Sequence, residues 1–86
     1  MAKIDSDTRK VLKDDPRRAF HLIVRVTGAP QTRAVALEEK GIKVRRRFRM
    51  TNSLGIECTG DAAVRLARLS WVDKIELDRP VSAFRR

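Results

Sequence analysis

The sequence predicts a small α+β domain built from four strands and two helices. Two observations support this prediction. Apolar and polar residues alternate in short runs, as in half-buried strands, and elsewhere apolar residues recur three and four positions apart, as on the buried side of a helix. With 86 residues the chain is long enough for one small domain and too short for two. We expect an N-terminal arm over 1–19, a domain over 20–78 and a tail over 79–86.

The stretch 54–78 predicts a strand, a helix and a second strand with few residues between them. Alternation places the strands at 54–59 and 73–78, and Thr59 can cap a helix over 60–69 by accepting a backbone N–H bond. Cys58 is the sole cysteine, so no internal disulfide can form. We interpret it as a small core residue rather than a reactive thiol.

The first half of the chain repeats this kind of pattern. A strand is predicted at 20–27, a helix at 30–40 that begins at Pro30 and ends before Gly41, and a strand at 42–50. In the arm, Asp5 or Ser6 can cap a short helix. Alternation along 42–50 predicts two sides. The expected core side holds Ile42, Val44, Phe48 and Met50, with Arg46 as an exception, and the other side holds Lys43, Arg45, Arg47 and Arg49.

The element order β-α-β-β-α-β is that of the ferredoxin-like split βαβ motif. Right-handed crossovers then give a four-stranded antiparallel sheet in the order 4-1-3-2, with both helices on one face. The opposite face is expected to be open. The residues predicted on it are His21, Ile23, Arg25, Lys43, Arg45, Arg47, Arg49, Glu57, Lys74, Glu76 and Asp78.

The net charge of +9 favours an acidic partner, which could be nucleic acid, an anionic membrane or an acidic protein. Five of the seven residues 43–49 are Lys or Arg. Charge on an edge strand also prevents unwanted strand pairing, which would explain the pattern without a ligand. Sheets that bind RNA usually carry aromatic residues on the binding face, whereas Phe48 is expected on the core side. A nucleic-acid-binding module that uses Arg25, Lys43, Arg45, Arg47 and Arg49 is therefore the alternative function.

Little in the sequence supports catalysis. His21 is the sole histidine, and no CxxC, HExxH, P-loop or GxGxxG pattern occurs. We therefore expect no enzymatic activity, no cofactor and no metal site. No run approaches the roughly 18 apolar residues of a membrane span, and the N-terminus lacks the apolar core of a signal peptide. The expectation is a cytoplasmic protein that is monomeric when free, or an extracellular one if the chain is a fragment of a secreted precursor.

An ordered set of short motifs runs from Phe20 to Phe84, about three-quarters of the chain. These motifs are Leu22-Ile-Val24, Glu39-Lys-Gly41, Ile42-Lys-Val44, Leu54-Gly-Ile56, Ala62-Ala-Val-Arg-Leu66 and Ile75-Glu-Leu-Asp78, followed by Arg79-Pro-Val81. With this set the chain resembles the propeptide, or inhibitor, domain of subtilisin-like serine proteases. That family also includes free-standing inhibitors.

The resemblance implies a domain that inhibits a subtilisin-like protease, on the same precursor or on a separate chain, and assists its folding. The open sheet face would lie on two surface helices of the protease, whose N-termini Glu76 and Asp78 would cap. The tail would then occupy the substrate cleft as an added strand. Its residues are Arg79, Pro80, Val81, Ser82, Ala83 and Phe84.

Three positions depart from the family pattern. Arg85 and Arg86 extend beyond its usual end, and Trp71 stands where the family has a small or turn residue. A structural or oligomerising domain of the same fold is the third interpretation of the chain.

Overall fold

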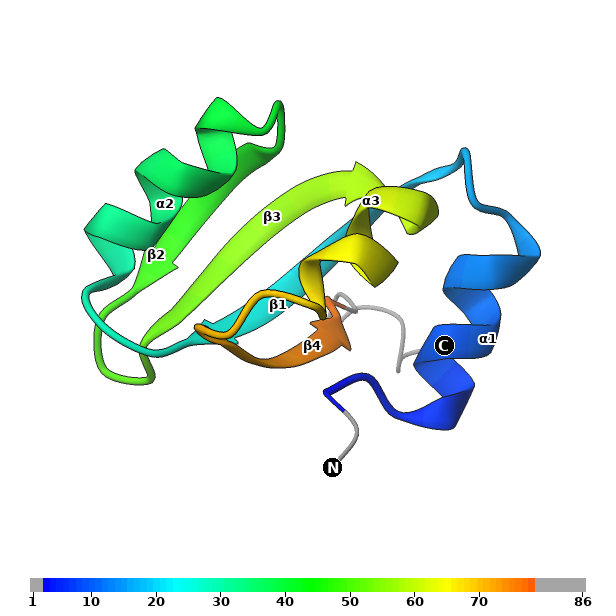
Figure 1. The fold of residues 1–86 in the computed structure, drawn as a ribbon, viewed down its shortest axis with the longest axis horizontal. Coiled ribbons are helices and arrows are strands. Elements are labelled where there is room, and N and C mark those ends of the chain that lie inside the picture. Colours follow the sequence, from blue (N-terminus) through cyan, green and yellow to red (C-terminus); the bar gives the residue numbers. More distant parts are fainter. Residues whose placement is uncertain (1–2, 79–86) are drawn as a thin grey trace, which may run out of the picture.

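The computed structural model describes residues 3–78. The elements follow the order α1 (Ser6–Asp14), β1 (Ala19–Val26), α2 (Pro30–Glu39), β2 (Lys43–Phe48), β3 (Ser53–Thr59), α3 (Gly60–Leu66) and β4 (Val72–Leu77). The strands form one antiparallel sheet in the order β2-β3-β1-β4, which reads β4-β1-β3-β2 from the other edge (Figure 1). A small α+β domain with a four-stranded antiparallel sheet, as expected, is therefore confirmed.

Local sequence signals set the helix ends. The Asp5 side chain accepts a hydrogen bond from the Thr8 N–H at 2.8 Å, and the Thr59 hydroxyl accepts one from the Ala62 N–H at 3.2 Å. Gly41 follows α2 with φ of +84°, a conformation that glycine adopts without steric penalty. The predicted caps are therefore confirmed.

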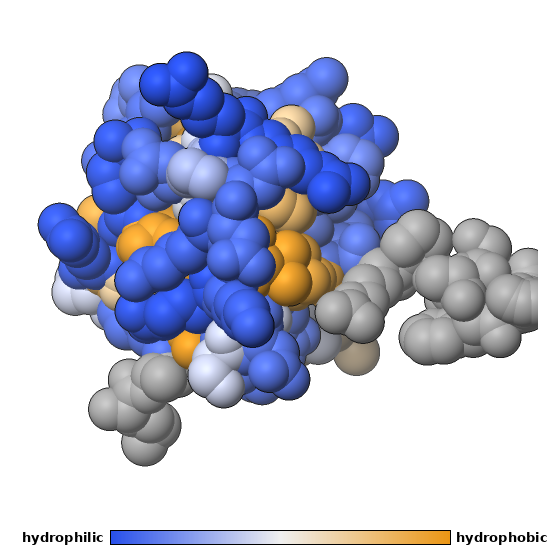
Figure 2. Space-filling model, turned by 90° about the vertical axis from the view of Figure 1, so that its right-hand side faces the viewer, coloured by the Kyte–Doolittle hydropathy of each residue, from blue (hydrophilic) through white to orange (hydrophobic). Residues whose placement is uncertain are grey.

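Helices α2 and α3 cover one face of the sheet, and the core lies between these layers (Figure 1). The core residues are Ile4, Leu12, Phe20, Leu22, Val24, Val26, Ala34, Leu37, Ile42, Leu54, Ile56, Ala63, Leu66, Val72 and Ile75. Val35 on α2 is 53% exposed and lies outside the core. Seen from the end at which α1 lies, the surface is mostly hydrophilic with small apolar patches (Figure 2).

The residues that precede β1 are packed against the rest of the domain. Leu12 on α1 is completely buried, and α1 lies against α3. Ile4 forms a parallel bridge with Ile75 of β4, and the Lys3 carbonyl accepts a hydrogen bond from the Ile75 N–H at 2.9 Å. The packed unit therefore begins before residue 20 and covers part of the outer edge of β4.

The contact between α1 and α3 depends on Gly60. A side-chain carbon at this position would overlap the Leu12 carbonyl oxygen and lie 3.1 Å from the carbonyl carbon. The loop after α1 also accepts two hydrogen bonds from the start of α3. The Gly60 N–H donates to the Arg18 carbonyl at 3.2 Å, and the Asp61 N–H donates to the Pro16 carbonyl at 2.9 Å. These bonds satisfy amides that a helix N-terminus otherwise leaves unpaired.

Replacing Gly60 with alanine should therefore lower the free energy of unfolding by about 3 kcal/mol, because α1 must move away and the two bonds weaken. Urea unfolding measures this. Gly41→Ala is the matched control, because no atom lies within 4 Å of a side-chain carbon there. In that variant the free energy of unfolding should fall by only about 1 kcal/mol, because alanine adopts the left-handed conformation less readily than glycine. Equal losses in the two variants would contradict the proposed overlap.

Candidate docking surface on the open sheet face

A β-bulge in β2 decides which side chains reach the open face of the sheet. Val44 pairs with Ile56, and the next pair is Arg46 with Gly55, so Arg45 is an extra residue on the β2 side. Directly paired residues point to the same face of a sheet. The alternation in β2 therefore shifts by one position after Val44.

The shift, and the turn that follows Phe48, make five of the sequence predictions wrong, those for Arg46, Arg47, Phe48, Arg49 and Met50. Arg46 and Phe48 lie on the open face, because they pair with residues of β3 that face away from the helices. Arg47 pairs with the buried Leu54 and lies on the α2 side, where it lines a hollow with Arg49, Val35, Pro30 and Gln31. Met50 belongs to the turn after β2 and is 99% exposed, not on the core side.

The open face is organised as rows of residues that run across the strands. From the β2–β3 turn towards the end of β4, the first row is Phe48, Ser53, Arg25 and Lys74. The second row is Arg46, Gly55, Ile23 and Glu76. The third row is Lys43, Glu57 and His21, and the Asp78 N–H extends it by donating to the His21 carbonyl at 2.9 Å. Asp78 thus follows Glu76 on the same face.

A hollow lined by two apolar residues, Ile23 and Phe48, and by five polar ones lies at the centre of the first two rows. It has a volume of about 360 Å³. Its lining residues are Ile23, Arg25, Phe48, Thr51, Ser53, Lys74 and Glu76. The Phe48 ring lies close to Gly55, because a side-chain carbon on Gly55 would be in ordinary contact with Phe48 Cε2 at 3.6 Å. We call this feature the Ile23–Phe48 hollow.

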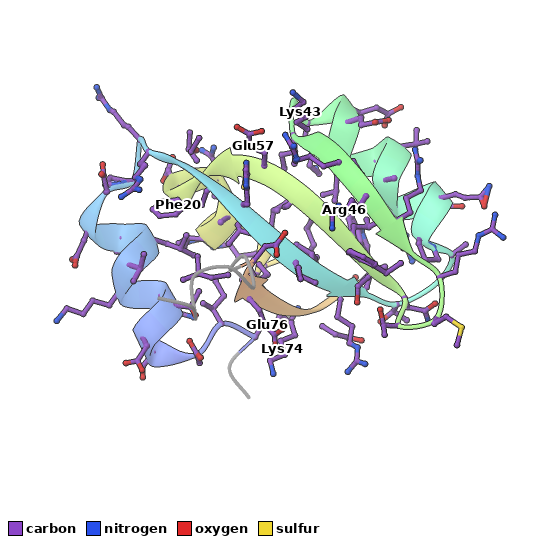
Figure 3. The ribbon with its side chains drawn as sticks, turned by 180° about the vertical axis from the view of Figure 1, so that it is seen from behind. Phe20, Lys43, Arg46, Glu57, Lys74 and Glu76 are labelled. Atoms are coloured by element: carbon purple, nitrogen blue, oxygen red, sulfur yellow. The ribbon has the colours of Figure 1, made fainter. Side chains whose placement is uncertain are left out.

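Cations and carboxylates lie next to each other on the open face, where Figure 3 labels Lys43, Arg46, Glu57, Lys74 and Glu76. Glu57 accepts from Arg45 Nη1 at 3.3 Å and lies 3.6 Å from His21 Nε2, while Lys74 Nζ lies 2.9 Å from Glu76 Oε2. The Arg46 side chain makes no hydrogen bond or ion pair within residues 3–78. Arg25, Lys74 and Glu76 therefore line the hollow, and Arg46 lies beside it in the second row. The other two carboxylates, Glu57 and Asp78, belong to the third row.

The structure brings some of the predicted site residues together and leaves others undescribed. Glu76 lies opposite Ile23 at the rim of the hollow, with Asp78 in the adjoining row. Residues 79–84, which were predicted to occupy a protease cleft, lie outside the described range, as do Arg85 and Arg86. Phe48 and Arg46 belong to the surface but were not predicted on it.

Trp71 packs against the loop that follows β1. The Arg33 guanidinium lies 4.9 Å from the centre of the Trp71 ring, and Arg33 Nε donates to the Thr27 carbonyl at 2.8 Å. The Thr27 N–H in turn donates to the Trp71 carbonyl at 2.8 Å. Through these contacts Trp71 links the α3–β4 connection to α2 and to the loop after β1, on the side away from the hollow.

Two further findings concern residues 3–78. Their His, Cys, Asp and Glu side chains form no group of three or more that could hold a metal ion. None of the helices within this range has the length and apolar character needed to cross a membrane.

Burial raises the pKa of the Cys58 thiol to about 11. The folded protein should therefore react with iodoacetamide at pH 8 about 100-fold more slowly than the urea-unfolded protein, because only the thiolate is nucleophilic. Labelling followed by mass spectrometry measures both rates. The rate in the folded protein should rise with pH until the thiol titrates. Equal rates in the folded and unfolded protein at pH 8 would contradict a half-buried thiol with a raised pKa.

Comparison of the chain with protein-family models, with curated proteins and with solved structures finds no match. The evidence for a function is therefore the open face itself, with its rows of paired residues, its hollow and its charges.

Proposed function

We propose that this chain is a non-catalytic, ferredoxin-like domain that binds and inhibits a subtilisin-like serine protease through its open sheet face. The observation that carries the proposal is an uncovered sheet face that presents two carboxylates where β4 ends. Glu76 and Asp78 lie in neighbouring rows of that face. Two carboxylates at this spacing suit the N-termini of two neighbouring helices, where unpaired N–H groups and the helix dipole favour negative charge.

The composition of the face supports docking to a protein surface. Ile23 and Phe48 supply an apolar centre, and charged side chains surround it. Stable protein interfaces have this arrangement, in which a desolvated centre is enclosed by a polar rim. A complex of standard size would bury about 1,600 Å² in total. The surrounding cations favour a protease whose docking surface is acidic.

The two carboxylates differ in how readily they can meet a partner. Glu76 is paired with Lys74, but both side chains are more than half exposed, so this pair is weak and can rearrange. Asp78 makes no side-chain hydrogen bond or ion pair within residues 3–78. Asp78 therefore gives up no ion pair when it caps a helix, whereas Glu76 must share its charge with Lys74.

In this proposal residues 79–84 continue from β4 into the substrate cleft, and Phe84 stands before the position of cleavage. The domain would also assist folding of the protease, because it binds the folded helices and lowers the free energy of the folded state. The protease would be part of the same precursor or a separate chain. The domain would act in the same compartment as that protease.

Steady-state inhibition of a subtilisin with a chromogenic peptide tests the carboxylates. Glu76→Gln and Asp78→Asn should each weaken inhibition by about 10-fold, because each removes a charge-assisted bond to a helix N-terminus. The matched control is Glu38→Gln with Glu39→Gln, which removes two exposed carboxylates from α2. A control that weakens inhibition as much as the open-face variants would count against the proposed contact.

The same assay tests the tail. A version that ends at Phe84 should inhibit at least as well as the full chain, whereas a version that ends at Asp78 should lose competitive inhibition because the cleft stays empty. Circular dichroism confirms that each version is folded. Undiminished inhibition by the version ending at Asp78 would rule out the tail-in-cleft mechanism.

A further inference from the structure

We propose that the basic end of the open face binds single-stranded nucleic acid. In this proposal a base stacks on Phe48, and Arg25 and Arg46 contact the backbone phosphates. The observation behind it is an aromatic ring among cations from three strands, an arrangement that the bulge in β2 creates. The proposal goes beyond protease docking and does not depend on it.

Phe48 has the placement that a stacking side chain needs. Its ring lies against the backbone of Gly55, where no side chain separates it from the sheet, and it is half-buried at the edge of the Ile23–Phe48 hollow. Sheets that bind single strands splay bases out on such aromatic residues. Any base can stack in this way, so the binding would have little sequence preference.

The cations stand where the backbone of a stacked strand would run. Arg25 and Lys74 share the row of Phe48, and Arg46 lies in the next row. Arg46 has no ion pair within residues 3–78, and Arg25 donates one N–H to the Thr51 carbonyl at 3.4 Å. Most of their donors are therefore available for phosphate oxygens.

Cations on the other side of β2 extend the surface around the edge of the sheet. Arg47 and Arg49 lie on the α2 side, and Lys43 lies at the far end of the strand. With the net charge of +9 they attract a polyanion at long range. A duplex would meet these cations but not Phe48, because its bases stack on one another.

Fluorescence anisotropy with labelled oligo(U) and oligo(dT) of about 10 nucleotides tests the stacking contact. Phe48→Leu should weaken binding by about 5- to 100-fold, because leucine keeps the apolar bulk but lacks a π face. Phe48→Tyr should retain the affinity. Val11→Ala, at an exposed apolar position on α1, should leave the affinity unchanged. Equal effects of Phe48→Leu and Phe48→Tyr, or equally tight binding of a duplex, would overturn the proposal.

The dependence of the affinity on salt tests the phosphate contacts. Arg25→Gln with Arg46→Gln should reduce the slope of log K against log salt by about 1.4, since each phosphate contact on a single strand contributes about 0.7. Lys10→Gln with Lys13→Gln removes the same charge from exposed positions on α1 and should leave the slope nearly unchanged. If the two double variants have equal salt slopes, the nucleic acid is attracted by net charge alone and not held at a defined site, which would overturn the proposal.

Glu76→Gln separates this inference from the proposed protease docking. The variant removes a negative charge beside the hollow and releases Lys74, so nucleic acid should bind more tightly while protease inhibition weakens. Loss of nucleic acid binding in this variant would overturn the inference. Inhibition without nucleic acid binding would also overturn it and leave the docking proposal standing. Nucleic acid binding without protease inhibition by any version of the chain would overturn the docking proposal and support this inference.

Discussion

The extra residue in β2 is the constraint on which the character of the open face depends. Because Arg45 has no partner of its own in the β3 ladder, every later residue of β2 points to the face opposite to the one that uninterrupted alternation would give. Without the bulge, Phe48 would turn toward α2, and Arg47 would project from the open face. The sheet would then present a basic surface without an apolar centre. Because of the bulge, the charged edge strand β2 contributes the Phe48 ring to the lining of the hollow.

The sequence signals that proved reliable are local ones. Thr59 and Asp5 cap helices, Gly41 adopts the left-handed conformation after α2, and the strands lie within a few residues of their predicted bounds. Each of these features depends on residues that are close in the chain. The face of Glu76 was also predictable, because β4 alternates regularly from Lys74 onward and pairs with β1 without interruption there.

The position of Phe48 could not be read from β2 itself. Three arginines follow one another at the bulge, so the shift in alternation leaves no change of polarity to detect. The available signal was Gly55 in the neighbouring strand, since a glycine inside a strand often marks a bulge or a close approach of another group. Gly55 meets both descriptions, as it pairs with Arg46 at the bulge and the Phe48 ring lies close to it. The role of Gly60 was hidden for a similar reason, because α1 reaches it only in the folded chain.

The bridge between Ile4 and Ile75 has a consequence for how the chain folds as it is synthesised. The central strand β1 acquires one neighbour from β3 and the other from β4. The segment before α1 pairs with β4 through Ile4, and Lys3 Nζ donates to the Leu69 carbonyl of the α3–β4 connection at 2.7 Å. Contacts between residues this far apart in sequence require closure of long loops, which slows folding. A nascent chain that has left the ribosome only through α3 has an unpaired edge on β1 and no partner for Ile4. The domain therefore completes its fold after translation has passed β4, and its N-terminal segment is among the last parts to become ordered.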